Sequence, residues 1–475
     1  MLLETGHNTM RIVMFSINPI FPDVVTGGAS KHLKHIAGHL GSMGNHVEIL
    51  CASADDLKQP FTWGQNVTVS PVLPFHLPFP QPYAVSGAAL GRIVSAVAEA
   101  LVDADRFYIH DGELLIPDIY HDIPTVISFR DNNYPESVLG TFIDKPDNVI
   151  CVSEYSAEVI KHTAGLYYKG LNERIHVVNN GIDFSVFRPV DTHKIASELN
   201  IKPDKDLILL HPHRPEPGKG LPETIRVVDK LVHQNNIKNI KVLILDWITS
   251  MMSEGDAGFY QEMIQMMHAL KVRENFLFIP WLPNERMPEY YSLGKVTLSL
   301  GNIVEAFGNV AYESIACGTP SIVACVGAHR NLLPDDKIEK VNYGDIDEAV
   351  KRVVKLLSTE QTVKNARAFL KENFDFDSQV QAYADMIIQT EKREPIQFSL
   401  PKYDPDQAYR VAPWCFVEGS QIYHDFSGVF MDAHGLEKLT GSYGDFTESD
   451  SVQAGISDSV WQTWIDRTWI VPVSI

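Results

Sequence analysis

The sequence predicts an α/β protein built from two doubly wound parallel-sheet units, followed by a C-terminal extension. Along residues 10–371, short continuous apolar runs bounded by polar turns alternate with helical patterns. Continuous apolar runs are typical of strands that are buried on both faces, and such strands form parallel sheets covered by helices. The chain has 475 residues, which is more than one ordinary domain holds. Two such units are therefore expected.

The apolar runs fall into two groups, and these groups define the predicted domains. Residues 10–190 form an N-terminal domain with the runs "RIVMFSI", "HVEILCA", "RFYIH", "PTVISF" and "NVICVS". Residues 191–371 form a C-terminal domain with "DLILLHP", "KVLILDW", "NFLFIPW", "KVTLSL" and "PSIVACV". A linker is expected near "FRPVDTHK", and a helix within residues 372–394 is expected to close the second unit. Residues 1–9 are an N-terminal extension.

Residues 395–475 form a C-terminal extension of a different texture. The segment is rich in acids but also contains Trp414, Trp461, Trp464 and Trp469. Disordered tails are poor in aromatic residues, so this segment is expected to fold or to dock onto the body. Three roles stay open: a cap over an acceptor site, a subunit contact that builds a homo-oligomer, and a small core of its own.

Composition and charge exclude several classes of partner. Apolar residues make up 45% and charged residues 21%, close to the averages of soluble globular proteins. The formal net charge of -20 repels nucleic acid and anionic lipid alike. The five cysteines are scattered without metal-binding or disulfide-rich spacing, and the N-terminus has no basic region followed by a long apolar run. We expect a cytoplasmic protein with no nucleic-acid partner and at most a peripheral membrane association.

Two glycine-bearing loops are candidates for phosphate binding. Gly27 and Gly28 precede a helical pattern, where backbone amides at the positive end of the helix dipole can approach an anion. An ordinary loop is the alternative. In "LHPHRPEPGKGLPE", Arg214 and Lys219 flank a glycine- and proline-rich turn before another helix. Two cations at this spacing can hold a diphosphate and neutralise it as a leaving group, whereas the alternative is a pair of solvated surface cations.

Two glutamates in "EAFGNVAYESIACGTP" suggest a ligand that is contacted at two places. If residues 305–313 were wholly helical, Glu305 and Glu313 would be separated by about 12 Å along the axis and about 80° around it. This separation does not suit an acid/base pair acting on one bond. We expect Glu305 in a loop facing a sugar and Glu313 in a helix accepting ribose hydroxyls, with Gly308 and Asn309 exposing amides between them. A capping acid and a solvated acid are the alternative.

Together these motifs resemble a known family. Gly27-Gly28, "NNGIDFSVFRP", Arg214 with Lys219, and Glu305-x7-Glu313 followed by "CGTP" resemble the large retaining glycosyltransferase family of GT-B fold, often labelled family 4. The similarity covers residues 10–392. It implies two Rossmann-like domains facing across a cleft, which holds a nucleotide-sugar donor.

The resemblance also implies roles for individual residues. Arg214, Lys219 and Glu305 are the implied catalytic residues. No metal or cofactor is expected to be required, because Arg214 and Lys219 can neutralise the charge of the leaving group. The resemblance implies that the departing phosphate helps to deprotonate the acceptor hydroxyl, so no side-chain nucleophile is required. The donor is expected to be a UDP- or GDP-sugar, and the sugar is transferred with retention. The implied donor-binding residues are Gly27, Gly28, Arg214, Lys219, Glu305, Phe307, Gly308, Asn309, Val310 and Glu313.

Several positions depart from the family pattern. Arg130 stands where the family commonly has histidine, so contact with phosphate and contact with an acidic acceptor are both open for it. His110 and Asp111 are expected on the acceptor side, although a core-edge histidine is the alternative. The glycine-rich turn usual after "KVLIL" is replaced by "DWITSMMSEGD". Base recognition by that segment is therefore not predicted.

The acceptor is predicted only as a class: a small molecule, a lipid-linked molecule or a glycan. The proline-rich segment with Phe75, His76, Phe79 and Tyr83 forms either an acceptor wall or a packed loop. Asp103-Ala104-Asp105 has metal-site spacing but precedes a strand, whereas ligand sites lie at the carboxyl ends of strands. We therefore expect no metal site there.

Two other functions are compatible with these motifs. A nucleotide-sugar epimerase or hydrolase of the same fold would need no acceptor. A non-catalytic nucleotide-sugar-binding protein would bind without turnover. A donor-only assay and a broad acceptor panel separate these functions from a transferase.

Overall fold

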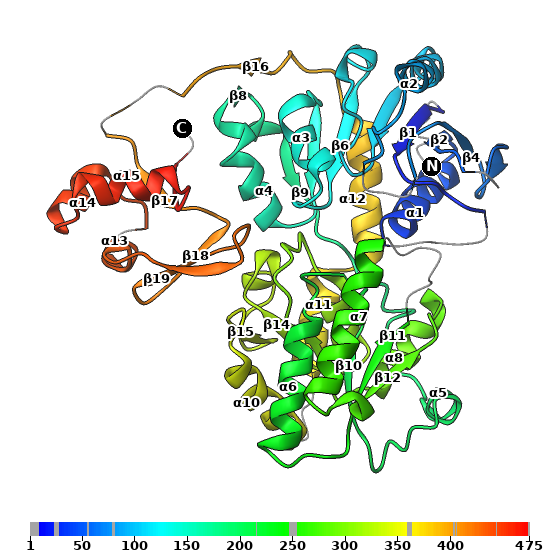
Figure 1. Cartoon of the computed structure of the whole chain (residues 1–475). Coiled ribbons are helices and arrows are strands. Elements are labelled where there is room, and N and C mark those ends of the chain that lie inside the picture. Colours follow the sequence, from blue (N-terminus) through cyan, green and yellow to red (C-terminus); the bar gives the residue numbers. More distant parts are fainter. Residues whose placement is uncertain are drawn as a thin grey trace, which may run out of the picture. The chain divides into compact units, whose positions relative to one another are not determined.

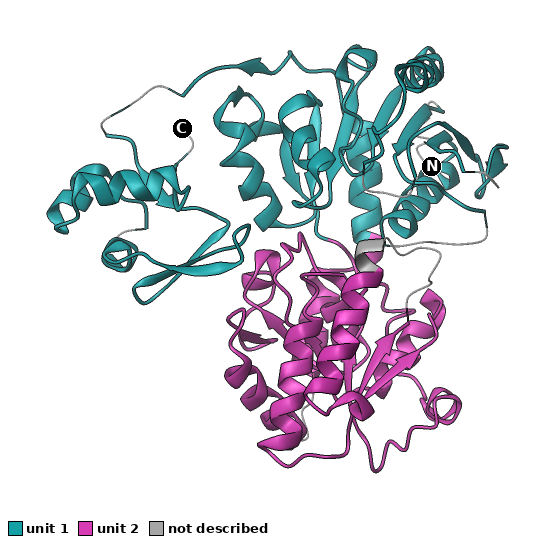
Figure 2. Ribbon diagram, viewed as in Figure 1, with its two compact units in different colours: residues 1–179, 378–475 teal, residues 180–377 magenta. Residues whose placement is uncertain are grey.

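A computed structural model describes residues 9–22, 28–54, 57–77, 81–214, 216–246, 254–358, 363–401, 404, 406–442 and 444–473. The chain divides into two compact units, coloured separately in Figure 2. Unit 1 comprises residues 1–179 and 378–475, and unit 2 comprises residues 180–377. No helix within the described ranges is long and apolar enough to cross a membrane.

Unit 1 contains an eight-stranded sheet of order β3-β4-β2-β1-β5-β6-β7-β9. All neighbouring pairs are parallel except β3 with β4. The helices are α1 (Gly28–Ser42), α2 (Gly87–Leu101), α3 (Pro135–Ile143) and α4 (Glu154–Lys161). The strands are β1 (Arg11–Ser16), β2 (His46–Ala52), β3 (Phe61–Thr62), β4 (Val67–Leu73), β5 (Arg106–Ile109), β6 (Thr125–Phe129), β7 (Asn148–Cys151) and β9 (Ile175–Val177).

Unit 2 contains a six-stranded parallel sheet of order β12-β11-β10-β13-β14-β15. Its strands are β10 (Leu207–His211), β11 (Ile240–Leu245), β12 (Phe276–Ile279), β13 (Val296–Ser299), β14 (Ser321–Ala324) and β15 (Glu339–Val341). Its helices are α5 (His193–Glu198), α6 (Leu221–His233), α7 (Glu254–Ala269), α8 (Met287–Leu293), α9 (Asn309–Ala316), α10 (Ile346–Ser358) and α11 (Lys364–Asn373).

Both sheets reverse their strand order at one place. In unit 1 the chain starts in the middle with β1 and continues outward to one side, then returns to the other side at β5. In unit 2 the corresponding neighbours are β10 and β13. Open α/β sheets bind ligands outside the carboxyl ends of the strands at such switch points. The topology therefore nominates two positions for a site, one in each unit.

The apolar runs predicted from sequence form the strands at the centre of both sheets. Strand β1 has Ile12 and Met14 on one face and Val13 and Phe15 on the other, and all four are buried in cores on opposite sides of the sheet. Strand β10 is also buried, with Leu209 in the core of unit 2. Burial on both faces explains why the runs are continuous rather than alternating.

Helix α12 (Phe376–Gln389) packs differently from our expectation. The sequence predicts that this helix closes the second unit. Instead, Tyr383, Ala384 and Ile387 are fully buried in the core cluster of unit 1 that contains α1 and one face of the eight-stranded sheet. The predicted helix is present, but the prediction of the unit against which it packs was wrong. The apolar stripe of a helix shows which face is buried, and it does not show which domain covers that face.

The C-terminal extension forms a core of its own. Its helices are α13 (Leu436–Ser442), α14 (Glu448–Gln453) and α15 (Asp458–Asp466), coloured orange to red in Figure 1. Its strands are β17 (Tyr409–Val411), β18 (Cys415–Glu418), β19 (Gln421–His424), β20 (Val429–Asp432) and β21 (Ile470–Pro472). The four tryptophans are buried together in one hydrophobic cluster. The small core is the one of the three open roles that the structure supports.

The extension contacts the first sheet unit at several places. Strand β16 (Gln397–Phe398) pairs with β8 (Tyr168–Lys169), and Val159 of α4 joins the extension's hydrophobic cluster. Beside it, the Tyr155 hydroxyl donates to Oδ2 of the buried Asp425 at 2.7 Å. The aromatic residues of the extension therefore stabilise a packed body.

Candidate functional site

A pocket lies in unit 2 at the switch point between β10 and β13. Three loops supply its walls: the loop after β10, the loop after β13 and the short turn after β14. The lining residues are His213, Gly218, Lys219, Ser299, Gly301, Ile303, Glu305 and His329. The pocket therefore lies where this type of sheet binds ligands, and it contains one cation, one carboxylate and two imidazoles.

Glycines let the first two loops pack directly against each other. The Ile303 amide donates to the Gly218 carbonyl at 3.1 Å. A β-carbon on Gly301 would collide with the Gly218 carbonyl oxygen, and one on Gly220 would lie 2.5 Å from the Gly301 nitrogen. Gly220 also has φ of +87°, in the left-handed region that favours glycine. These contacts fix the position of Lys219 relative to the loop that carries Glu305.

Lys219 and Glu305 form the central ion pair of the pocket. The Lys219 ammonium donates to Oε1 of Glu305 at 2.6 Å, and the two side chains are 19% and 24% exposed. Burial by itself raises the pKa of Glu305, but the charge and hydrogen bond of Lys219, with help from His329 and Arg214, hold that pKa below its usual value. Burial likewise lowers the pKa of Lys219, and Glu305 raises it above its usual value overall. Both groups are charged at neutral pH.

The two pocket histidines are neutral. Burial lowers the pKa of His329 to about 4, with further lowering from Lys219 and Lys340 against the opposing charge of Glu305. Burial is also the main cause that lowers the pKa of His213. Nε2 of each ring is buried and has no hydrogen-bond partner among the described residues. A ligand that enters the pocket therefore meets two uncharged imidazoles with unmet hydrogen-bonding capacity.

Glu305 lies in a loop and Glu313 in a helix, as the sequence predicts. Helix α9 begins at Asn309, so Glu305 lies in the preceding loop and Glu313 lies in the helix. Glu313 accepts a hydrogen bond from the Tyr291 hydroxyl at 3.1 Å. Gly308 caps the helix with φ of +84° and without a side-chain cap. The first turn of α9 is thus open at the backbone.

Other predicted donor residues have mixed surroundings. The Phe307 side chain is 3% exposed and packs edge-on against Tyr312 and Phe374, which leaves backbone atoms as its means of contacting a ligand. Asn309 accepts from the Asn180 side-chain amide at 3.3 Å, which ties "NNGID" to α9. Val310 is half-buried in the first turn.

Two predicted phosphate contacts are only partly described. The Arg214 side chain is 50% exposed and pairs with Glu216 at 3.2 Å, so it lies at the surface near Lys219. Gly27 lies outside the described residues, and Gly28 is the exposed first residue of α1. The segment "WITSMM" also lies outside the described residues.

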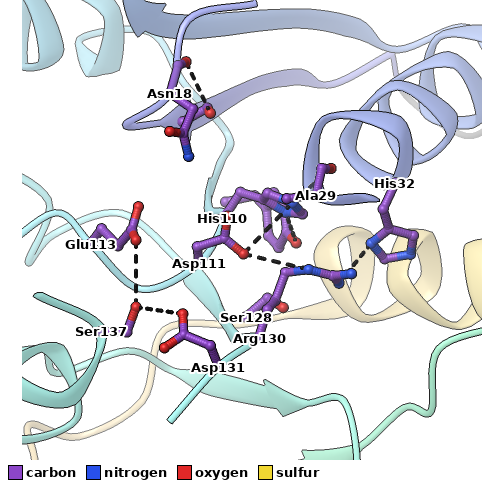
Figure 3. A network of polar contacts seen from close by, with 12 residues as sticks. Asn18, Ala29, His32, His110, Asp111, Glu113, Ser128, Arg130, Asp131 and Ser137 are labelled. Atoms are coloured by element: carbon purple, nitrogen blue, oxygen red, sulfur yellow. Dashed lines mark hydrogen bonds and ion pairs between the residues drawn. The ribbon is translucent and has the colours of Figure 1, made fainter. Parts of the chain in front are cut away.

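The predicted acceptor-side residues of unit 1, His110, Asp111 and Arg130, form a largely buried polar network, drawn in Figure 3. Nδ1 of His110 lies 2.8 Å from the Tyr108 hydroxyl, and its Nε2 lies 3.1 Å from the Ala29 carbonyl. Asp111 pairs with the Arg130 guanidinium at 3.4 Å. His110 is 1% exposed, so its surroundings are those of a satisfied core-edge histidine.

Arg130 connects three elements of unit 1. Besides Asp111, its guanidinium contacts Nδ1 of His32 on α1 at 2.8 Å and donates to the Tyr383 hydroxyl on α12 at 3.3 Å. Both α1 and α12 pack on the same face of the sheet. The arginine therefore fastens two helices to the end of β6.

The proline-rich segment is largely part of the core. Phe75 is 6% exposed and packs edge-on against Tyr83, whose hydroxyl donates to the Glu113 carbonyl at 2.7 Å. These two residues belong to a packed loop and not to an acceptor wall. His76 is exposed, and Phe79 lies outside the described residues. Asp105 accepts from the Arg11 amide at the amino ends of the strands, which gives it a structural role.

Sequence reasoning missed several pocket residues. His213 and His329 were passed over, although His213 stands inside the loop quoted for Arg214 and Lys219. A signal was available for His213, since it follows the carboxyl end of a predicted strand at the switch point. The same signal was available for Ser299, which ends the predicted strand β13 at the switch point. His329 carries no such signal, because only the packing of three loops brings it to the pocket.

Family models match most of the chain in two segments. Residues 194–373 match the model described as "Glycosyl transferases group 1", and residues 26–186 match "Glycosyltransferase Family 4". The first segment spans the strands and loops that build the pocket. The second lies in the sheet of unit 1.

Curated relatives are similar over a part of their length. A D-inositol 3-phosphate glycosyltransferase of Acidothermus cellulolyticus is 30% identical over 166 residues, which are 34% of this chain and 36% of that protein. One of Xylanimonas cellulosilytica is 26% identical over 234 residues, 47% of this chain and 53% of that protein. The matched segment thus spans 36% and 53% of the length of these two relatives.

Solved structures are similar over most of the chain. Sucrose-phosphate synthase of Thermosynechococcus elongatus has a TM-score of 0.65 at 15% identity and covers 79% of this chain and 98% of its own. Anabaena Alr3699/HepE, solved in complex with UDP and glucose, has a TM-score of 0.63 at 19% identity and covers 79% and 99%. These likenesses confirm the GT-B fold.

Proposed function

The chain belongs to the group 1 glycosyltransferases of the family 4 type, and on this premise we propose that it is a retaining glycosyltransferase. It transfers a sugar from a nucleoside-diphosphate sugar to an acceptor hydroxyl. The observation that carries the proposal is the Lys219–Glu305 pair, held at 2.6 Å in a pocket at the switch point of unit 2.

The pocket suits a diphosphate leaving group. Departure of a nucleoside diphosphate concentrates negative charge on phosphoryl oxygens, and a fixed cation in a partly buried site stabilises that charge. Lys219 is such a cation, and the half-exposed Arg214, which pairs with Glu216, lies at the surface nearby. The uncapped first turn of α9 adds backbone amides and the positive end of a helix dipole.

The two carboxylates divide the remaining parts of the donor between them. Glu305 lies beside Lys219 and lines the pocket. We propose that it accepts hydrogen bonds from hydroxyls of the transferred sugar. Glu313 is half-buried on α9 and already accepts from a phenol, so it is placed to accept ribose hydroxyls. In the reaction the bond between the anomeric carbon and the phosphate oxygen breaks, the acceptor oxygen bonds to that carbon on the same face, and the acceptor proton passes to the departing phosphate.

The donor is proposed to be a UDP- or GDP-sugar used without a metal ion. Structures of Anabaena Alr3699/HepE, a structural neighbour, contain UDP, UDP with glucose, or UDP-glucose. With Lys219 and Arg214 near one another, the charge of the leaving group is balanced without a divalent cation. We propose a small-molecule, lipid-linked or glycan acceptor, and the curated relatives named for D-inositol 3-phosphate make inositol phosphates the first acceptors to assay.

Calorimetric titration of UDP, GDP, ADP and TDP, with and without EDTA, tests donor binding. One diphosphate is expected to bind tightly, and EDTA is expected to leave its affinity unchanged. The matching nucleotide sugar is then assayed with D-inositol 3-phosphate, a sugar-phosphate panel and short glycans, and the anomeric configuration of the product is read by NMR.

Each outcome of these assays has a definite meaning. Product with the configuration of the donor supports the retaining transferase. Loss of the sugar to water at the same rate with and without acceptors identifies a hydrolase, and an altered sugar identifies an epimerase. Tight donor binding without turnover across the panel identifies a binding protein. Absence of binding to all four diphosphates would contradict the proposal.

A further inference from the structure

His329 presents a buried ring nitrogen to the pocket without a partner. The residue is 4% exposed and lies in the short 3₁₀ turn Gly327–Arg330 after β14. Its Nε2 has no hydrogen bond among the described residues, although the ring lines the pocket together with Lys219 and Glu305. A buried polar atom without a partner is energetically unfavourable, because it has lost its hydrogen bonds to water. A ligand atom that pairs with it would recover this loss.

The other nitrogen of the ring determines which atom carries the proton. Nδ1 of His329 lies 2.8 Å from the Tyr312 hydroxyl, and Tyr312 is 1% exposed. Either atom can be the donor in this contact, and we assign the proton to the phenol, because a buried Tyr312 hydroxyl that accepted here would leave its own proton unpaired. If the phenol donates to Nδ1, the neutral ring must carry its own proton on Nε2. The group that faces the pocket is therefore a hydrogen-bond donor.

The ring also lies at the start of α9. A β-carbon on Gly308 would collide with Cε1 of the imidazole and would lie 2.5 Å from Nε2, so this edge of the ring is next to the helix cap. The cap has no side-chain hydrogen bond, and its first-turn amides carry the positive end of the dipole of an eight-residue helix. Two independent features thus meet at one place: open helix amides and an unpartnered N–H donor.

We propose that His329 binds the nucleotide-sugar substrate. Its neutral Nε2–H donates a hydrogen bond to a phosphoryl oxygen of the nucleoside diphosphate at the first turn of α9. The inference rests on the proposed function and adds a residue and an atom to it. Lys219 lines the same pocket, so the bound phosphate has a full positive charge on one side and an uncharged donor on the other.

An uncharged hydrogen-bond donor suits the position of His329 for an electrostatic reason. Glu305, Lys219 and Lys340 are the charged groups that act on His329, and burial is the main cause of its low pKa of about 4. The ring is therefore neutral over the physiological range. It can orient the phosphate without adding a charge that changes with pH.

Two amide substitutions separate the two ring nitrogens. In His329→Asn the short amide can stay near Tyr312 but does not reach the position of Nε2. In His329→Gln the longer amide places an N–H donor near that position. His193→Asn is the matched control, because the His193 side chain is 95% exposed in the same unit. Each variant is titrated with the diphosphate that wild type binds, with the matching nucleoside and with the matching nucleotide sugar, after circular dichroism has verified its fold.

His329→Asn is expected to bind the diphosphate about tenfold or more weakly, the effect of one hydrogen bond to a charged group. Its affinity for the nucleoside is expected to stay unchanged, His329→Gln to recover most of the loss, and His193→Asn to match wild type. The ratio between wild type and His329→Asn is expected to be constant from pH 6 to pH 8.

Several results would overturn the assignment. Equal diphosphate affinity in wild type and His329→Asn would do so, and so would equal losses in the Asn and Gln variants, which would indicate packing. A loss confined to the nucleotide sugar would move His329 to the sugar. A ratio that grows toward pH 6 would show a charged imidazolium. Wild type that binds no diphosphate would overturn the proposed function itself, and this result is distinct from the others.

Discussion

Replacement of Lys219 by methionine tests the electrostatic argument for the pocket most directly. The methionine keeps most of the side-chain volume and removes the charge. At 2.6 Å from Glu305, the ion pair has a gross attraction of about 6 kcal/mol at an effective dielectric constant of about 20. Most of this is offset by the desolvation of both groups, as is usual for buried pairs.

Lys219→Met should change activity more than stability. Loss of one preorganised charge contact in the transition state costs about 2 to 4 kcal/mol, which is about 30- to 1,000-fold in kcat/KM. The unpaired Glu305 carboxylate should lower the free energy of unfolding by about 1 to 3 kcal/mol, less than for a fully buried pair because a fifth to a quarter of each side chain is exposed. Steady-state kinetics and urea unfolding measure the two effects separately.

A second substitution separates the two effects further. In Lys219→Met/Glu305→Gln no unpaired charge remains, so stability should return toward that of wild type while activity stays low. Lys230→Met is the control, because Lys230 forms a 2.5 Å ion pair with the 70% exposed Asp347 on the surface of the same unit. It should change stability by less than about 1 kcal/mol and leave kcat/KM unchanged.

The stability effect should also depend on pH with a definite sign. The folded pKa of Glu305 lies below the unfolded value of 4.5, so its contribution to stability is present above pH 4.5 and is lost as the pH falls through the folded pKa. The stability difference between wild type and Lys219→Met should therefore shrink in acid. Activity within a few-fold of wild type, or a stability difference that stays constant from pH 3 to pH 7, would refute the reasoning.

Three further substitutions test neighbouring parts of the structure. Gly308→Ala should lower the free energy of unfolding by about 1 kcal/mol or more and weaken diphosphate binding, because φ is +84° and the new β-carbon collides with the His329 ring; urea unfolding and calorimetry measure both, and unchanged values would contradict the geometry. Glu313→Ala should mainly raise the donor KM, and an unchanged KM in steady-state kinetics would argue against its ribose role. Burial raises the pKa of Asp144 to about 8, so its neutral form stabilises unit 1 below the unfolded pKa of 3.8 and this contribution is lost as the pH rises toward 8; Asp144→Asn should therefore gain stability over wild type at pH 8 relative to pH 5, and a pH-independent difference in urea unfolding would exclude this.

The central strands were predictable because both faces of each are buried. Their apolar runs are continuous, and their short length between polar turns favours strands over buried helix segments. Strand β4 was harder to recognise, since it contains Pro71 and runs into the proline-rich segment. Pro71 pairs with Cys51 next to a register shift, which is the kind of irregularity where a strand tolerates proline. Strand β15 has three residues, two of them charged, and carries almost no pattern.

The site was predictable only where a residue type and a topological position coincide. Lys219 and Glu305 follow the two strands that flank the switch point, so chemistry and topology both indicate them. The neutrality of His329 and the engagement of Arg130 depend on which side chains surround them in three dimensions. Neither burial nor hydrogen-bond partners of single polar residues can be read from spacing alone.

The two switch points of this chain differ in which of their polar groups are already paired. In unit 1, Arg130 contacts Asp111, His32 and Tyr383, and both ring nitrogens of His110 have partners. Nε2 of His32, Oδ1 of Asp111 and Oε2 of Glu113 have no hydrogen-bond partner among the described residues. A ligand that engages Arg130 or His110, however, would have to replace interactions that already exist, and the exchange of one hydrogen bond for another contributes little net free energy.

In unit 2 the unpaired atoms line the pocket itself. Nε2 of His213 and of His329 has no partner among the described residues, and the first turn of α9 has no side-chain cap. A phosphate or sugar oxygen at these groups would pair polar atoms that folding leaves unpaired. Each such contact would recover most of the desolvation penalty of the protein atom, and this recovered free energy would strengthen binding. The Arg130 contacts in unit 1 thus fasten α1 and α12 to the sheet, whereas we propose that the unpaired groups of the unit 2 pocket bind the nucleotide-sugar donor.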